Sequence, residues 1–167
     1  KTYGDVILAP FLGNHDTMRP GSFMPGEENV KMAAGILSMM NGGTFVYYGE
    51  EIGMKGSRGG ANTDANRRLA MLWGDDDLIR DPVGSTYPQK NQITTTVADQ
   101  LEDENSLLRY YCKLLTIRHK YPAIARGEYT ALSSGKNFGG FSIQYEGETI
   151  GVLHNNSGEE LSCDLSS

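Results

Sequence analysis

Apolar residues in the first third of the chain follow three successive patterns. Residues 6–12 are apolar almost without interruption, which is typical of a strand buried on both faces of a parallel sheet. The next pattern has helical spacing and ends at Asn41-Gly42-Gly43, because glycine accepts the left-handed turn that closes many helices. Its apolar face comprises Val30, Ala33, Ala34, Leu37 and Met40. Residues 44–48 are β-branched and aromatic, so the sequence predicts strand, helix and strand in succession.

A second helical pattern covers residues 106–121. Ser106, or Asn105 before it, can cap its first turn, and Pro122 prevents its continuation. Its apolar stripe consists of Leu107, Leu108, Tyr111, Leu114 and Leu115. The sequence therefore predicts one long amphipathic helix here.

The regions before and after that helix have sequence patterns of other kinds. Residues 53–103 are polar and rich in Gly, Asp, Asn and Thr, and a loop this long within a compact domain is usually functional. After Gly127 the alternation has period two, which predicts a hairpin of residues 140–145 and 149–155 and a third short strand at 161–165.

Polar residues gather where both predicted strands end. Asn14-His15-Asp16 follows the first strand directly, and Gly49-Glu50-Glu51 follows the second. Parallel α/β barrels carry their chemistry at the carboxyl ends of their strands. The ends of the two predicted strands are therefore the expected position of a functional site.

Four segments resemble the α-amylase family of glycoside hydrolases. Phe11-Leu12-Gly13-Asn14-His15-Asp16 is similar to the family's segment at the end of the seventh barrel strand, and residues 43–54, Gly-Thr-Phe-Val-Tyr-Tyr-Gly-Glu-Glu-Ile-Gly-Met, are similar to its eighth strand. Residues 67–73, Arg-Arg-Leu-Ala-Met-Leu-Trp, resemble an Arg…Pro-Met-Gln-Trp stretch more loosely, because Ala70 and Leu72 replace Pro and Gln. The helix at 106–121 and the following Pro122-Ala123 resemble the last barrel helix and its exit into a small β domain.

The resemblance implies an α/β fold, the last part of a (β/α)8 TIM barrel followed by a partial antiparallel β domain. Residues 1–126 would form strands seven and eight, a long loop and the last helix, and residues 127–167 would begin a small β-sandwich domain. A complete barrel takes about 250 residues, and two strands cannot close one. We therefore expect this chain to be the carboxyl-terminal portion of a larger enzyme.

The resemblance also implies roles for the polar triplet in a retaining glycosidase. Such an enzyme uses a nucleophile and an acid/base about 5 Å apart, and the family carries both on earlier strands. Asp16 would be the third carboxylate, which stabilises the positive charge of the transition state. His15 would hydrogen-bond hydroxyls of the same sugar, and Asn14 would orient the pair.

For two further residues, the sequence allows two roles each. Arg19 is expected either to bind a substrate hydroxyl or to neutralise Asp16, and Trp73 either to stack on a sugar or to pack within its loop. Tyr47 and Tyr48 are expected to pack in the barrel, while Glu50 and Glu51 are expected to hold loops. No cofactor and no metal site are assigned, although calcium is possible in the part of the enzyme outside this chain. Asp75-Asp76-Asp77 offers oxygen ligands for calcium but lacks a dedicated loop pattern, so a solvated acidic turn is favoured.

Composition and charge indicate which classes of binding partner to expect. A net charge of −6 argues against nucleic acid, and no run of 18 apolar residues predicts a membrane span. With its 21 glycines counted, about half of the chain is apolar, as in ordinary globular proteins. The expected partners are an α-glucan or malto-oligosaccharide and either the remainder of the barrel or a second copy. Localisation is left open between extracellular and cytoplasmic.

The functional hypothesis is an enzyme that acts on α-glucosidic bonds of starch-like substrates, with these 167 residues inactive alone. Hydrolysis and glycosyl transfer are not separated by the sequence. The alternative is a non-catalytic protein that keeps the barrel as a carbohydrate-binding or interaction module. For the small β domain, a structural lid is favoured over glycan binding.

Overall fold

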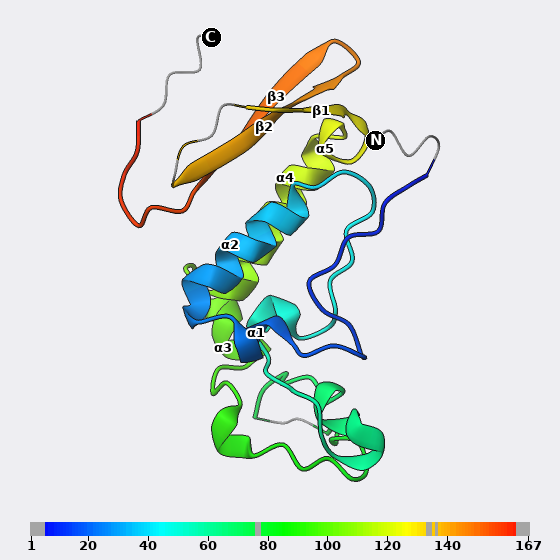
Figure 1. Ribbon diagram of the computed structural model, residues 1–167. Coiled ribbons are helices and arrows are strands. Elements are labelled where there is room, and N and C mark those ends of the chain that lie inside the picture. The colour runs from blue at the N-terminus through cyan, green and yellow to red at the C-terminus, as the bar shows by residue number, and fades with distance from the viewer. Residues whose placement is uncertain (1–5, 76–77, 133–134, 136, 163–167) are drawn as a thin grey trace.

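The computed structural model describes residues 6–75, 78–132, 135 and 137–162 (Figure 1). Its α-helices are α1 Pro20–Phe23, α2 Gly26–Ser38, α3 Val97–Glu102, α4 Leu107–Lys120 and α5 Ala123–Arg126. Short 3₁₀ turns, η1 to η4, cover Glu50–Ile52, Ala61–Thr63, Ala65–Arg67 and Gln89–Asn91. The strands are β1 Glu128–Ala131, β2 Phe138–Tyr145 and β3 Glu148–Asn155.

Residues 6–12 and 44–48 run side by side and parallel, as predicted for neighbouring barrel strands. The Gly43 N–H donates to the Leu8 carbonyl at 2.8 Å, and the Phe45 N–H donates to the Pro10 carbonyl at 2.9 Å. The predicted full strands are corrected, however, because the two segments form only one isolated parallel bridge, Phe11 to Phe45. Pro10 has no N–H to extend the ladder.

The main core lies between α2 and α4, which run alongside each other in Figure 1. Ala34 of α2 and Tyr111 of α4 are 0% and 1% exposed. Further buried members are Val30, Met39, Leu107, Leu114, Ala123, Ile124 and Ile143. Both predicted helices are confirmed, and the Ser106 hydroxyl caps α4 by accepting from the Arg109 N–H. Two predicted core positions, Met40 and Leu115, are instead exposed.

The small sheet has the order β1-β2-β3 and is antiparallel throughout. The predicted hairpin is present as β2 and β3, and its turn is Glu146-Gly147. β1 was not predicted, although it pairs with β2 from Glu128 onward. The predicted third strand is not seen at Leu161 and Ser162, and its remaining positions lie outside the described residues.

The long loop has a packed core of its own. Ile52, Met54, Leu69 and Met71 are buried together, so the region between η1 and α3 folds on itself. α3 was also not predicted, and a capping box between Thr96 and Asp99 starts it. Within the described residues, no helix is long and apolar enough to cross a membrane.

Candidate active site

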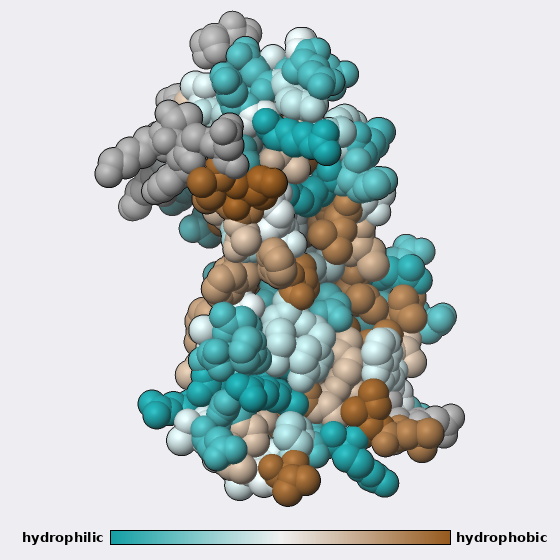
Figure 2. Space-filling model, turned by 90° about the vertical axis from the view of Figure 1, so that its right-hand side faces the viewer, coloured by the Kyte–Doolittle hydropathy of each residue, from teal (hydrophilic) through white to brown (hydrophobic). Residues whose placement is uncertain are grey.

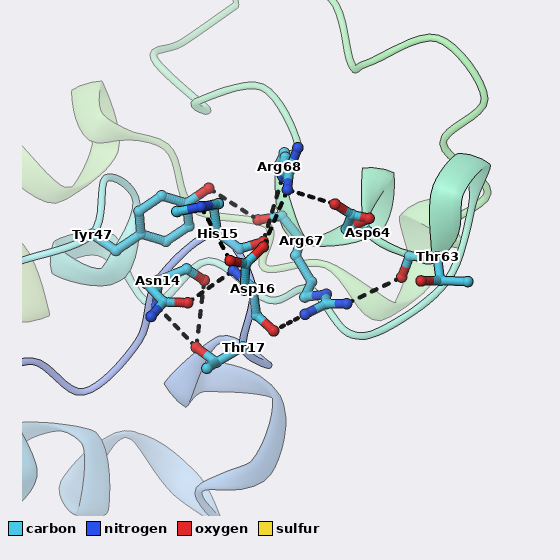
Figure 3. A network of polar contacts seen from close by, with 9 residues as sticks. All are labelled: Asn14, His15, Asp16, Thr17, Tyr47, Thr63, Asp64, Arg67 and Arg68. Atoms are coloured by element: carbon cyan, nitrogen blue, oxygen red, sulfur yellow. Dashed lines mark hydrogen bonds and ion pairs between the residues drawn. The ribbon is translucent and has the colours of Figure 1, made fainter.

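The triplet Asn14-His15-Asp16 lies in a tight turn that hydrogen-bonds to itself (Figure 3). The Asn14 amide oxygen accepts from the Asp16 N–H at 2.8 Å, and the Asn14 N–H donates to the Thr17 hydroxyl at 2.9 Å. The Thr17 N–H donates back to the Asn14 carbonyl at 3.3 Å. These bonds fix the backbone of the turn where the first parallel segment ends.

Two side chains of the turn, His15 and Asp16, face solvent beside each other. The His15 Nε2 lies 3.2 Å from the Asp16 Oδ2, and the two side chains are 60% and 67% exposed. Both can therefore contact a ligand that approaches from the solvent side.

Two arginines from the long loop hold this turn. The Arg68 Nη2 lies 3.2 Å from the Asp16 Oδ1 and 2.5 Å from the Asp64 Oδ2, and its Nε is 3.4 Å from the His15 carbonyl oxygen. Arg67 donates to the Asp16 carbonyl and, at 3.3 Å, to the Thr63 carbonyl. Sequence reasoning quoted both arginines within a family match but gave them no role. The loose Arg…Met-x-Trp match was the signal that could have identified them.

Arg19 lies elsewhere, behind the site. It is 1% exposed, and its guanidinium carbon sits 4.5 and 4.7 Å from the ring centres of Tyr47 and Tyr48. Its Nη1 donates to the Tyr48 carbonyl at 2.5 Å and its Nε to the Arg67 carbonyl at 3.1 Å. The structure thus turns Arg19 inward, away from the exposed face of His15 and Asp16. It ties the end of the second segment to the arginine loop.

Glu50 forms a buried polar contact beneath the turn. It is 2% exposed, and its Oε1 accepts from the Tyr111 hydroxyl of α4 at 3.0 Å. A Cβ placed on Gly13 would lie 3.5 Å from the Glu50 Oε2, which locates this carboxylate directly behind the triplet. Burial raises the pKa of Glu50 from 4.5 to about 7, although the Tyr111 hydrogen bond and Arg19 both oppose the rise.

An open hollow of about 400 Å³ lies against the turn. Its lining includes Phe11, Asn14, His15, Phe45, Val46 and Tyr47. The polar side chains of the turn therefore border an apolar surface formed by the two parallel segments.

Trp73 and the acidic run lie further along the loop. The Trp73 side chain is half-exposed, and its carbonyl accepts from the Ala98 N–H of α3 at 3.0 Å. Asp75 is exposed, while Asp76 and Asp77, which complete the calcium candidate, lie outside the described residues. Across the described part of the chain, no group of three or more His, Cys, Asp or Glu side chains could hold a metal ion.

Comparison with known proteins identifies the family. Residues 2–127 match the family model of the α-amylase catalytic domain. The chain belongs to the α-amylase family of glycoside hydrolases. The match ends at Gly127, directly before β1 begins at Glu128.

Three relatives show how much of an α-amylase-family protein this chain represents. It is 34% identical to the α-amylase SusG of Bacteroides thetaiotaomicron, over 96% of this chain and 24% of SusG. A 4-α-glucanotransferase of Thermotoga maritima is 27% identical, over 94% of this chain and 36% of that protein. The solved structure of Amy13B from Eubacterium rectale superposes with a TM-score of 0.79 and 36% identity, over 90% of this chain and 30% of that one. The chain thus spans about a quarter to a third of the length of these relatives.

Proposed function

We propose that this chain forms the carboxyl-terminal part of the (β/α)8 barrel of an α-glucan-acting enzyme. Its contribution to catalysis is Asp16, the carboxylate that stabilises the transition state. The observation that carries the proposal is the exposed His15–Asp16 pair, held in a closed turn by Arg67 and Arg68 at the end of a parallel segment.

The proposed chemistry follows from charge. Cleavage of a glycosidic bond places positive charge on the anomeric carbon and the ring oxygen of the sugar. A fixed carboxylate favours that state over the neutral substrate, so the Asp16 charge lowers the barrel enzyme's activation free energy. The His15 ring hydrogen-bonds hydroxyls of the same sugar, and the Asn14 amide oxygen holds the Asp16 backbone.

A retaining double displacement also needs a nucleophile and an acid/base carboxyl. We place both on barrel strands other than the two in this chain, so the 167 residues alone should be inactive. The same missing strands would cover the apolar side of the hollow at Phe11 and Phe45.

The substrate class follows from the family and from the site. A starch-like glucan or malto-oligosaccharide is uncharged, and the amylase and glucanotransferase relatives carry names that refer to such substrates. The half-exposed Trp73 ring would stack on a neighbouring sugar. The choice between water and a sugar acceptor is left to segments outside the chain.

The test is Asp16→Asn in the complete protein that carries this chain, assayed on malto-oligosaccharides. Loss of one preorganised electrostatic partner typically lowers kcat by about 10²–10³-fold, and KM should change far less. Asp103→Asn, at a loop carboxylate that accepts from the Asn105 N–H, is the matched control and should retain activity. A loss below about tenfold, or equal losses in kcat and affinity, would contradict the role of Asp16. Binding of malto-oligosaccharide without any turnover by the unmodified complete protein would favour the non-catalytic alternative.

A further inference from the structure

Arg68 is shared by two carboxylates with very different surroundings. Its Nη2 contacts the Asp16 Oδ1 at 3.2 Å and the Asp64 Oδ2 at 2.5 Å. The Asp16 side chain is 67% exposed, whereas the Asp64 side chain is only 20% exposed. Figure 3 shows Arg68 between the two, with Asp64 on the side away from His15.

The shielded contact is the one that can fix the arginine. An exposed ion pair is worth little, because ordering two long side chains costs conformational entropy and water screens their attraction. A short charge-assisted bond to a shielded carboxylate is stronger, and it orients the planar guanidinium fork. Once Asp64 holds one side of the fork, Arg68 meets the Asp16 carboxylate and the His15 carbonyl at little further entropic cost.

The backbone that carries Asp64 is fixed by other bonds. Asp64 lies between η2 and η3, where its carbonyl accepts from the Arg67 N–H at 2.9 Å. The Asn66 amide bonds to Thr86 twice, through the Thr86 N–H at 2.7 Å and the Thr86 hydroxyl at 3.1 Å. The Gly59 N–H donates to the Thr63 carbonyl at 2.8 Å. A change confined to the Asp64 carboxylate therefore leaves the loop held.

We propose that Asp64 is a positioning residue for Asp16: it anchors the Arg68 guanidinium, which in turn orients the Asp16 carboxylate and the His15 carbonyl. The inference rests on the proposed role of Asp16 and extends it to a residue 48 positions further along the chain, on the long loop. Asp64 affects the orientation of the Asp16 carboxylate. We therefore expect it to influence the step in which charge develops on the sugar, and not the binding of the sugar.

The kinetic test compares Asp64→Asn with Asp64→Glu in the complete protein. Asp64→Asn keeps the shape and removes the charge, and it should lower kcat about tenfold with KM unchanged within about twofold. Asp64→Glu restores the charge and should bring kcat back to within about threefold. Asp81→Asn, at a carboxylate of the same loop that accepts from the Ala70 N–H, makes the same charge change without touching Arg68 and should leave kcat unaltered. An unchanged kcat for Asp64→Asn, or a rise in KM that accounts for the whole loss, would overturn the proposal.

A crystal structure of the Asp64→Asn protein tests the anchoring without any assay. The Arg68 Nη2 should move beyond about 4 Å from the Asp16 Oδ1, outside ion-pair distance, while the bond between Asn14 and the Asp16 N–H persists. An unmoved Arg68 would overturn the proposal. If the complete protein has no activity on α-glucosides, the proposed function fails, and this structure still decides whether Asp64 anchors Arg68.

Discussion

The α2–α4 helix pair and the two parallel segments at 6–12 and 44–48 are both rich in large apolar side chains, but the helices bury more of theirs. Leu37 of α2 is 2% exposed, whereas Ile7 is 80% and Phe45 is 63% exposed. The helices pack on each other, on α5 and on β2, while each parallel segment has the other as its strand neighbour. Figure 2, turned toward the side where these segments lie in Figure 1, shows apolar side chains gathered along that face.

Other parts of this chain bury the apolar faces of the helices, whereas the apolar faces of the parallel segments are left for a neighbour to bury. A barrel strand is hydrogen-bonded on both sides, so two strands expose edges as well as apolar faces. The exposed segments are also the ones that end at Asn14-His15-Asp16 and at Glu50. The candidate site thus lies on the two segments whose apolar side chains this chain leaves exposed.

The largest expected effect follows from those edges. We predict that the isolated 167 residues associate, with another copy or with the remainder of the barrel, because open strand edges and apolar patches seek partners. The double variant Ile7→Lys and Phe45→Lys should shift the isolated chain toward monomer in sedimentation velocity. Leu101→Lys, at an exposed side chain of α3, is the matched control and should not. A soluble, well-folded monomer of the unmodified chain would contradict the prediction.

A pair of truncations sharpens the same comparison. Leu37→Ala should lower the free energy of unfolding by about 2–5 kcal/mol in the isolated chain and in the complete protein, because Leu37 is already buried within this chain. Phe45→Ala should cost less than about 1 kcal/mol in the isolated chain at concentrations where it is monomeric, but about 3–5 kcal/mol in the complete protein, where barrel strands would cover it. Denaturant unfolding measures both. Equal costs for Phe45→Ala in the two proteins would show that no neighbour buries this ring.

The same contrast explains which elements the sequence predicted. α2, α4 and the β2–β3 hairpin carry periodic patterns, since each buries one face against the other elements of this chain. α3 has only six residues, too few for a helical period, and its readable signal was the Thr96-x-x-Asp99 cap. The parallel segments have the composition of strands but form a single bridge. A strand also needs neighbouring strands to pair with, and the composition of a segment does not show whether they are present.

Only the part of the candidate site that is contiguous in the sequence could be predicted. The polar turn at Asn14-His15-Asp16 follows from its place after an apolar run. Arg68 was missed because it lies 52 residues from Asp16 and reaches it through a fold that no local pattern encodes. Arg19 is three residues from Asp16, yet the chain turns into α1 at Pro20 and carries the guanidinium inward. Proximity in sequence therefore indicated the wrong arginine.

Glu50 links the two regions, and its titration is the smallest effect we predict. The folded-state pKa of about 7 exceeds the usual 4.5, so the folded chain holds this proton more tightly than the unfolded chain does. The resulting stabilisation is fully present below about pH 4.5 and is lost as the pH rises through about 7. Glu50→Gln retains an oxygen for the Tyr111 hydroxyl and has no charge to bury.

The stability of Glu50→Gln relative to the unmodified complete protein should therefore rise between about pH 5 and about pH 8, by at most roughly 3 kcal/mol. Denaturant unfolding at the two pH values measures the difference. Glu102→Gln, at an exposed glutamate at the end of α3, is the matched control, and its difference from the unmodified protein should be the same at both. A Glu50→Gln difference that stays constant with pH would mean that the carboxylate is already hydrated behind the site. The apolar helix core would then end short of the Asn14-His15-Asp16 turn instead of extending beneath it.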